Sequence, residues 1–558
     1  MGVLGLTSFV ENTPQLLLPL KIHDTRLVVD GHGLVHYLFH HSKIGYRHGG
    51  NYSEYEDLCV KFFKFLNLCN IKVYILFDGA HDLEDKKFRT TKERAKQQIQ
   101  RSLNIINGGG DRILPVFAFE VFVKVMDGME IPFVYCDFEA DNDIVALANA
   151  WGCSVLSQDS DFFVFDVKAG YIQLSHFWWK NPCILHAKKG EDEDQGCPVP
   201  DEEAPMVRLP ARFVRSVSKR NSHIQGTIYW LSEFEELNTA ITAVLKYLRK
   251  TEREQIRQKL ETSMQMYDLQ VGSKFKNYFE RCHMDSGLLT FQHCPALPGW
   301  AVALFRHGKF PFFCTTVLCQ RRHFTFNLIE DVTQKSCNRG PLNVRRVLYG
   351  ILLKQFSIEE SENNRDIMQG GQVDKSKKTL HVMEFDRDNL DLRQTRVEPL
   401  FHLPKCGNVP GISNIPELAV ASRKCLLMEV LGIDPVMVES FPLDIQLPVA
   451  VTVFWVHNAD PEIVPSHLQA LLLGFLKGCL SESLDQETQH CPETHEDDNL
   501  SESKEVPGED SAKVKGDEPS VTQQGAASFV SGTDERTNVK QLLSKHLGSI
   551  KKPTNRTD

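Results

Sequence analysis

The chain has 558 residues, of which 42% are hydrophobic and 24% are charged, and its formal net charge is −10 at pH 7. This composition is typical of globular proteins, and the length predicts roughly two to four domains. Residues 481–558 contain 16 acidic and 9 basic residues, so they hold seven of the ten net negative charges. The acidity argues against a nucleic-acid-binding protein as a whole, but most of it belongs to this C-terminal stretch.

The sequence shows no signal for membrane insertion or secretion. Residues 1–6 lack the charged and apolar regions of a signal peptide. The apolar run at residues 471–476 is too short to span a bilayer. The 15 cysteines form no Cys-x-x-Cys pair and no cluster with zinc spacing, which predicts reduced thiols in the cytosol or nucleus. We therefore expect a soluble protein with no membrane partner.

The first 180 residues alternate between short apolar runs and amphipathic patterns. The apolar runs, which predict strands, are residues 26–30, 71–77, 131–136 and 153–156. Between them, apolar side chains recur at helical spacing over 117–125 and 144–151. Strands that alternate with helices predict an α/β fold, in which helices cover both faces of a parallel sheet.

The remaining sequence predicts helical regions separated by polar segments. The expected order is a linker at 181–226, a helical region at 227–356, a polar linker at 357–378, a helical region at 379–480 and a disordered acidic tail at 481–558. Helices are expected over about 237–269 and around 344–351. Another is expected to begin at residues 414–416, where a cap residue precedes a proline, and to end at Gly432.

Each predicted strand is followed by acidic residues. They are Asp30, Asp78, Glu139, Asp141, Asp159 and Asp161. Because the carboxyl ends of parallel strands meet at one edge of a sheet, these side chains are expected to converge there. Their mutual repulsion favours neutralisation by a hard cation such as Mg²⁺ or Mn²⁺. Each acid alone would more simply be a turn or helix-capping residue, but repetition at four strand ends favours the metal site.

These acidic motifs also support a family resemblance. Residues 1–6, 28–31, 77–79, 139–141 and 158–161 together resemble the flap-endonuclease-like structure-specific nucleases. Weaker matches at residues 85–87, 178–180, 348–353 and 447–450 resemble the asteroid branch of that superfamily. The resemblance implies a PIN-like nuclease core over 1–180 and an asteroid-type C-terminal region over 379–480.

The resemblance also implies roles for individual residues. Two divalent ions are implied, the first held by Asp30, Asp78, Glu139 and Asp141 and the second by Asp141, Asp159 and Asp161. Gly2 is implied to lie near the active site, and His36 occupies the position of a DNA-stacking aromatic residue. Lys87 and Arg94 have the seven-residue spacing of the family's helical gateway, which places them on one helix face toward DNA. The alternative for this segment is a solvated basic helix.

One family element does not occur at its expected position. The resemblance implies a Gly-x-Asp motif roughly fifty residues after Asp161 and a helix-two-turn-helix module for duplex binding, but that position lies in an acidic, proline-rich segment at residues 187–224. A weakened second metal site and poor duplex binding are therefore expected. Single-stranded or 3′-overhang DNA should then be preferred to 5′-flap DNA.

Two functional hypotheses follow from these observations. The first is a Mg²⁺- or Mn²⁺-dependent DNA endonuclease that acts, as the resemblance implies, in double-strand break repair with other repair proteins, in the nucleus and also in the cytoplasm. The second is a catalytically weak nuclease-fold protein that serves as a scaffold or signalling adaptor. The presence together of carboxylates that repel one another favours the first hypothesis, because a site without metal would have no need for them. The absence of a Gly-x-Asp motif at its expected position favours the second.

Overall fold

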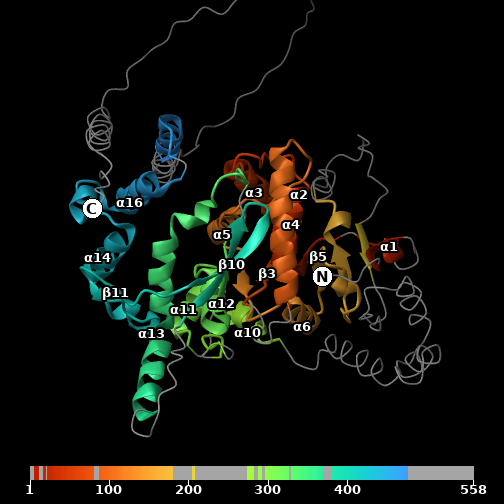
Figure 1. Cartoon of the computed structure of the whole chain (residues 1–558). Coiled ribbons are helices and arrows are strands. Elements are labelled where there is room, and N and C mark those ends of the chain that lie inside the picture. Colours follow the sequence, from red (N-terminus) through yellow and green to blue (C-terminus); the bar gives the residue numbers. More distant parts are fainter. Residues whose placement is uncertain are drawn as a thin grey trace, which may run out of the picture. The chain divides into compact units, whose positions relative to one another are not determined.

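Figure 1 shows the computed structural model of the chain. The described residues are 6–11, 17–20, 22–80, 87–179, 204–207, 273–281, 287–291, 294, 296–325, 329–367, 380–460 and 462–475. The chain divides into two compact units, Met1–Phe454 and Trp455–Asp558. None of the helices in these ranges is both long enough and apolar enough to cross a membrane.

A mostly parallel sheet forms the centre of the first unit. Its strands, in spatial order, are β1 (Leu17–Leu20), β7 (Ala204–Val207), β6 (Tyr171–Gln173), β5 (Ser154–Ser157), β2 (Thr25–Asp30), β3 (Ile71–Phe77) and β4 (Phe133–Tyr135). The five strands from β6 to β4 are parallel, and β1 and β7 pair antiparallel at one edge. The parallel sheet predicted from the apolar runs is therefore confirmed.

Helices cover both faces of this sheet, because successive strand residues point to opposite sides. On β2, Leu27 and Val29 belong to one buried cluster and Val28 to another. The N-terminal helices, with their bounds, are α1 (Leu6–Glu11), α2 (Gly31–His40), α3 (Tyr52–Leu68), α4 (Phe88–Ile106), α5 (Ala118–Gly128) and α6 (Asp141–Trp151). Buried residues of α2, α3 and α5 pack in the first cluster, and those of α6 pack in the second.

The described residues between 273 and 475 are mainly helical, as predicted. The helices are α10 (Lys276–Arg281), α11 (Gly299–Arg306), α12 (Phe312–Gln320), α13 (Leu342–Ile367), α14 (Val420–Leu431), α15 (Pro435–Glu439) and α16 (Leu443–Asn458). The 3₁₀ helices are η2 (Ser160–Phe163), η3 (Leu174–His176), η5 (Cys337–Arg339) and η6 (Ile412–Glu417). The predicted helix end at Gly432 is confirmed, since this glycine has a positive φ of 68°.

Several local expectations differ from the structure. Within the region expected to be helical, residues 382–408 form strands, which are β9 (Val382–Asp388), β10 (Asp391–Val397), β11 (His402–Leu403) and β12 (Gly407–Asn408). Helix α13 continues to Ile367, inside the expected polar linker, and residues 414–416 lie in η6 rather than at the start of α14. The only described part of the linker 181–226 is strand β7. The helix predicted at 237–269 and the tail 481–558 lie outside the described residues.

A smaller sheet has the strand order β10–β9–β8, and β8 spans Arg322–Phe324. Its strand β10 contacts helix α4. Strand β9 carries the buried residue Glu384, whose carboxylate accepts two hydrogen bonds from Arg345 of α13, at 2.7 and 2.9 Å. The hydroxyl group of Tyr349 donates to the same carboxylate at 2.6 Å. This buried group of polar side chains fixes the small sheet against α13, because each member depends on the others for its hydrogen bonds.

Replacement of Glu384 by leucine tests this connection. The Glu384→Leu variant should lose about 3–5 kcal/mol of unfolding free energy in a urea titration, because the Arg345 guanidinium then stays buried without its carboxylate. The matched control is Arg393→Ala, which breaks the exposed ion pair with Asp388 on the same sheet and should cost about 0–1 kcal/mol. Equal small losses in the two variants would contradict the proposed importance of the buried pair.

Candidate metal centre

The acidic residues that follow the strands lie at one edge of the main sheet. Asp30 is the last residue of β2, and Asp78 comes directly after β3. Asp141 begins α6 after β4, and Asp159 caps η2 after β5. Because β5, β2, β3 and β4 are adjacent and parallel, their carboxyl ends present these side chains side by side, as the sequence predicted.

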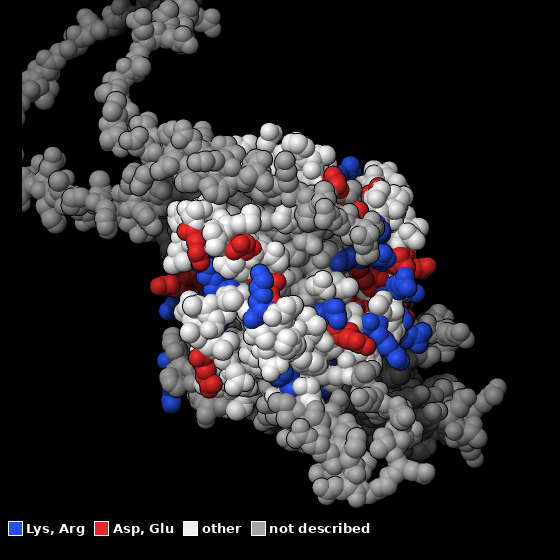
Figure 2. Space-filling model, turned by 60° about the vertical axis from the view of Figure 1, so that its left-hand side comes forward, with Lys and Arg blue, Asp and Glu red and all other residues white. Residues whose placement is uncertain are grey.

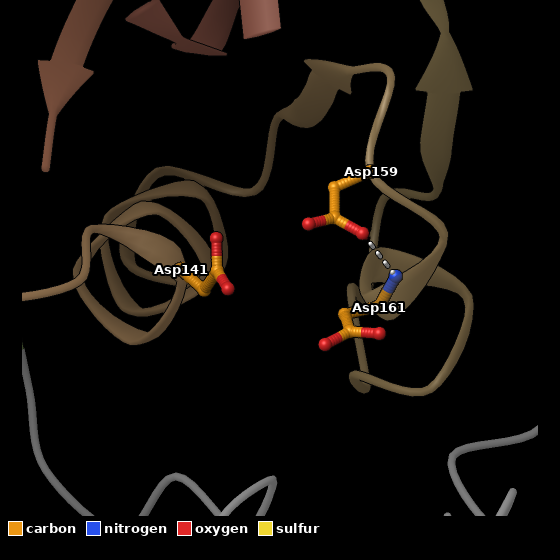
Figure 3. A group of neighbouring side chains, drawn as sticks. All are labelled: Asp141, Asp159 and Asp161. Atoms are coloured by element: carbon orange, nitrogen blue, oxygen red, sulfur yellow. Dashed lines mark hydrogen bonds between the residues drawn. The ribbon is translucent and has the colours of Figure 1, made fainter. Parts of the chain in front are cut away.

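Three of the carboxylates form a compact group. One oxygen from each of Asp141, Asp159 and Asp161 lies within 4.8 Å of the other two (Figure 3). Asp141 comes from the first turn of α6, and the other two come from the turn into η2. The backbone N–H of Asp161 donates to the Asp159 carboxylate at 3.1 Å, which holds the turn in place. These are the residues that the resemblance implied for a second ion.

Burial and like charge together change the acidity of this group. Loss of hydration, and then repulsion from Asp30, Asp78, Asp159 and Asp161, raises the pKa of Asp141 well above its usual value. Burial is also the main cause of the raised pKa of Asp30, which outweighs the hydrogen bonds that this carboxylate accepts. The electrostatic contributions indicate that the three carboxylates and the two strand-end acids act as one cluster.

Two residues that the sequence analysis missed hold Asp30 in place. The hydroxyl group of Ser157 donates to the Asp30 carboxylate at 2.6 Å, and it accepts from the backbone N–H of Asp159 at 3.0 Å. The backbone N–H of Gly33 donates to the other Asp30 oxygen at 3.0 Å. A Cβ atom at Gly33 would overlap this carboxylate. The only local signal was that Ser157 ends a strand and Gly33 follows Asp30 by three residues.

Asp78 is oriented by a different set of contacts. Its carboxylate accepts from the backbone N–H of Ala140 at 2.9 Å, which connects the end of β3 to the start of α6. Its own backbone N–H donates to Nδ1 of His32 at 3.1 Å, and that nitrogen lies 3.8 Å from the carboxylate. His32 therefore supports Asp78 from α2, a role that the sequence analysis did not assign.

Glu139 does not join the compact group. Its carboxylate forms an ion pair with the ammonium group of Lys87, next to the first residue of α4. This contact brings the predicted DNA-binding lysine to the acidic edge of the sheet. Arg94 lies two turns further along α4 and is exposed. Gly2 lies outside the described residues.

His36 lies on α2, where part of its surface is exposed and its ring lies beside those of His40 and Phe119. The pKa of His36 is lowered to about 4. The main cause is loss of hydration, and the smaller causes are the nearby groups of His32, His40 and Arg94. The imidazole ring is therefore neutral at physiological pH. It lies parallel to the ring of His40, with 5.7 Å between the ring centroids.

The distribution of charge over the surface is mixed. On the face drawn in Figure 2, the Lys and Arg side chains of described residues lie among Asp and Glu side chains, and neither sign dominates. A broad basic surface therefore does not identify a binding site on this face. The carboxylates at the edge of the main sheet identify the candidate site better than the overall surface charge does.

The carboxylate group fits a hard divalent cation. All three of its ligand atoms are carboxylate oxygens, which Mg²⁺ and Mn²⁺ prefer. Burial first, and then repulsion from the neighbouring carboxylates, raises the pKa of Asp141, and a positive ion would relieve that repulsion. Asp141, Asp159 and Asp161 would hold such an ion, and Asp30 and Asp78 lie beside them with carboxylate oxygens of the same kind.

The raised pKa values predict a pH-dependent effect of Mg²⁺ on stability. An acid whose pKa is higher in the folded than in the unfolded state, where it is near 3.8, costs stability as the pH rises through that interval. A bound cation offsets this cost, so Mg²⁺ should raise the melting temperature more at pH 7.5 than at pH 5. Differential scanning calorimetry with and without Mg²⁺ measures this difference.

The control for this experiment is a matched pair of variants. Asp141→Asn should abolish the Mg²⁺-dependent shift, whereas Asp166→Asn, which changes an exposed aspartate after η2, should keep it. An unchanged shift in the Asp141→Asn variant would show that Mg²⁺ binds elsewhere.

Comparison with known proteins identifies the family. The family model described as the Asteroid N-terminal domain matches residues 444–555. The Single-strand DNA endonuclease ASTE1 of Mus musculus is 33% identical over 511 residues, which cover 86% of this chain and 73% of that protein. The Homo sapiens protein of the same name is 31% identical over 518 residues, with the same coverage of both chains.

Among solved structures, human GEN1 in complex with Holliday junction DNA has 11% sequence identity and a TM-score of 0.27. The match covers 77% of this chain and 99% of that chain. Its low score adds nothing to the assignment, which depends on the sequence relatives. The identity to the mouse and human proteins extends over most of both chains, and the chain belongs to the asteroid family.

Proposed function

We propose that this asteroid-family protein is an endonuclease that hydrolyses phosphodiester bonds in single-stranded DNA with the help of divalent cations. The observation that carries the proposal is the compact group of Asp141, Asp159 and Asp161 at the carboxyl edge of a parallel sheet. The names of the mouse and human relatives, which describe single-strand DNA endonucleases, support the same activity.

Mg²⁺ or Mn²⁺ would fit these carboxylates. Asp141, Asp159 and Asp161 would hold one ion, and the residues that the resemblance implies for the other are Asp30, Asp78, Glu139 and Asp141. When bound, such ions supply charge that promotes attack by water and stabilises the leaving oxygen in phosphodiester hydrolysis. The carboxylates act as ligands and hold their positions through fixed hydrogen bonds. Ser157 and Gly33 orient Asp30, and Ala140 and His32 orient Asp78.

The DNA contacts of the proposal come from helices α2 and α4. Lys87 is the residue before the first turn of α4 and Arg94 lies about two helical turns further on, so the two project from nearly the same side. Their charges would bind phosphates near the carboxylates, where Lys87 already pairs with Glu139. The neutral imidazole of His36 would stack on an unpaired base.

The proposed substrate preference depends on residues 187–224, which occupy the position of the family's duplex-binding module. Without a Gly-x-Asp motif roughly fifty residues after Asp161, where the resemblance implies it, single-stranded or 3′-overhang DNA is favoured over a 5′-flap. By the family resemblance, the activity serves double-strand break repair together with other repair proteins, in the nucleus and also in the cytoplasm. A strong preference for 5′-flap DNA among these three substrates would contradict the substrate assignment.

The carboxylate variants test the catalytic proposal. Asp141→Asn and Asp159→Asn should each reduce Mn²⁺- or Mg²⁺-dependent cleavage of a single-stranded oligonucleotide by more than about 100-fold. Loss of a residue that only supports a metal ligand costs up to about 100-fold, and loss of a ligand itself should cost more. Asp166→Asn should cleave like the unchanged protein, because this aspartate lies outside the cluster. Kinetics of purified protein at matched concentration give the measurement.

The same experiment separates the scaffold hypothesis from the nuclease hypothesis. Equal cleavage by the unchanged protein and by Asp141→Asn would assign the activity to a contaminant or to another site. Calorimetric Mg²⁺ binding without any cleavage would favour a protein that keeps the site but acts as a scaffold or adaptor.

His36 gives a second, independent prediction. His36→Ala should weaken binding of a single-stranded oligonucleotide by about 1–3 kcal/mol, which is the usual contribution of one stacked base, and His36→Phe should retain the affinity. Because the pKa of His36 is lowered to about 4, the loss should be the same at pH 6 and pH 8. Fluorescence anisotropy in EDTA measures the affinity, and a loss that grows toward pH 6 would indicate a charged imidazole instead.

A further inference from the structure

The small sheet presents two chemically different faces, because side chains alternate along its strands. Strands β8 and β9 are parallel, with His323 opposite Glu384 and Phe324 opposite Phe385. Nδ1 of His323 lies 2.6 Å from the hydroxyl group of Tyr349 of α13, which in turn donates to Glu384. One face is therefore bound to α13 through buried polar contacts.

The other face carries an aromatic pair, Phe324 and Phe385, whose ring centroids lie 4.5 Å apart with 13° between the ring planes. Phe88, the first residue of α4, packs on this pair, with its centroid 5.6 Å from Phe385 and 6.1 Å from Phe324. The guanidinium carbon of Arg322 lies 4.3 Å from the centroid of Phe88. The first turn of α4 is thus held between the aromatic pair and a cation.

The contact between helix and sheet continues along α4. One turn after Phe88, the ammonium nitrogen of Lys92 lies 5.8 Å from the ring centroid of Phe385. Two turns further, the side-chain amide of Gln100 donates to the backbone carbonyl of Leu390, at the hairpin that joins β9 and β10. Figure 1 shows β10 (teal) beside α4 (orange). Contacts from residue 88 to residue 100 hold about 18 Å of helix.

The helix faces the sheet with one side and the acidic site with another. Each residue turns an α-helix by about 100°, so Lys87 and Arg94 project in nearly the same direction. Phe88 and Lys92 project at roughly 100° to 160° from that direction. Lys87 and Phe88 are adjacent in sequence, and the first pairs with Glu139 while the second packs on the aromatic pair. A shift of Phe88 must therefore move Lys87.

We propose that the β8–β9–β10 sheet is a positioning element for DNA binding, in which Phe324 and Phe385 hold Phe88 and thereby fix Lys87 at the carboxylate edge and Arg94 on the same side of α4. This inference rests on the proposed nuclease function. Lysine and arginine side chains are long and flexible, so a fixed helix backbone reduces the ordering cost when they bind phosphate. Correct placement also matters for the reaction, since a displacement of about 1 Å can lower the rate about 100-fold.

A double-mutant cycle tests whether Phe88 acts through Lys87. Phe88→Ala should lower kcat/KM for a single-stranded oligonucleotide by roughly 10–100-fold. Combined with Lys87→Ala, it should add little to the loss that Lys87→Ala causes alone, because the lysine that it positions is already absent. Multiplication of the two losses in the double variant would overturn the proposal.

Control variants separate positioning from general instability. Phe88→Leu keeps an apolar side chain on the aromatic pair and should recover most of the activity. Phe117→Ala removes a ring that is 58% exposed and lies next to α5 rather than the small sheet, and it should have no effect. Arg322→Gln removes the cation over Phe88 without a loss of apolar core, and it should lower kcat/KM in the same direction as Phe88→Ala. Full activity of Arg322→Gln and Phe88→Ala would overturn the proposal.

A readout without catalysis distinguishes failure of this proposal from failure of the nuclease function. Amide hydrogen exchange of the whole chain should become faster across residues 88–100 in Phe88→Ala and stay unchanged in strands β2 and β3. This result would support the positioning role even if the protein cleaves no DNA. Unchanged exchange in α4 would overturn the positioning role even if the protein is an active nuclease.

Discussion

Repulsion between carboxylates at one edge of a sheet is the constraint on which the rest of this structure depends. Four adjacent parallel strands end beside acidic residues, and the geometry of the sheet brings their charges together. The surrounding residues hold that arrangement. Ser157 and Gly33 fix Asp30 through hydrogen bonds, and a side chain at Gly33 would displace the carboxylate. The edge is thus a preorganised set of oxygen ligands.

Asp137 and Asp141, two acids near this edge, have different electrostatic surroundings. Asp137, which lies just before the site, is bound by Arg306 and Lys274. Burial alone would raise the pKa of Asp137, but these two cations hold it below its usual value. Burial and like charge instead raise the pKa of Asp141. Fixed basic side chains therefore neutralise Asp137, whereas burial and like charge disfavour the ionised form of Asp141, and a bound divalent cation would offset that repulsion.

Local sequence patterns were enough for strands β2 to β5 of the main sheet but not for its strands β1, β6 and β7 or for the small sheet. The strands β2 to β5 are apolar runs, so their burial on both faces is visible in the sequence. Strand β9 carries the buried charged residues Glu384 and Arg387, which a sequence pattern cannot distinguish from exposed ones. Its partners Arg345 and Glu330 come from distant segments. The same long-range pairing explains why strand β9 was not expected within the region 379–480, which was predicted to be mainly helical.

The sequence by itself determined the parallel sheet and the positions of Asp30, Asp78, Asp141 and Asp159 at its strand ends, because hydrophobic periodicity and strand boundaries are local properties. Tertiary structure decided which side chains contact one another. It grouped Asp141 with the two acids of the η2 turn, paired Glu139 with Lys87, and placed a sheet from the C-terminal half against α4. These contacts join segments far apart in the chain, so packing of the folded protein, and not local pattern, selects them.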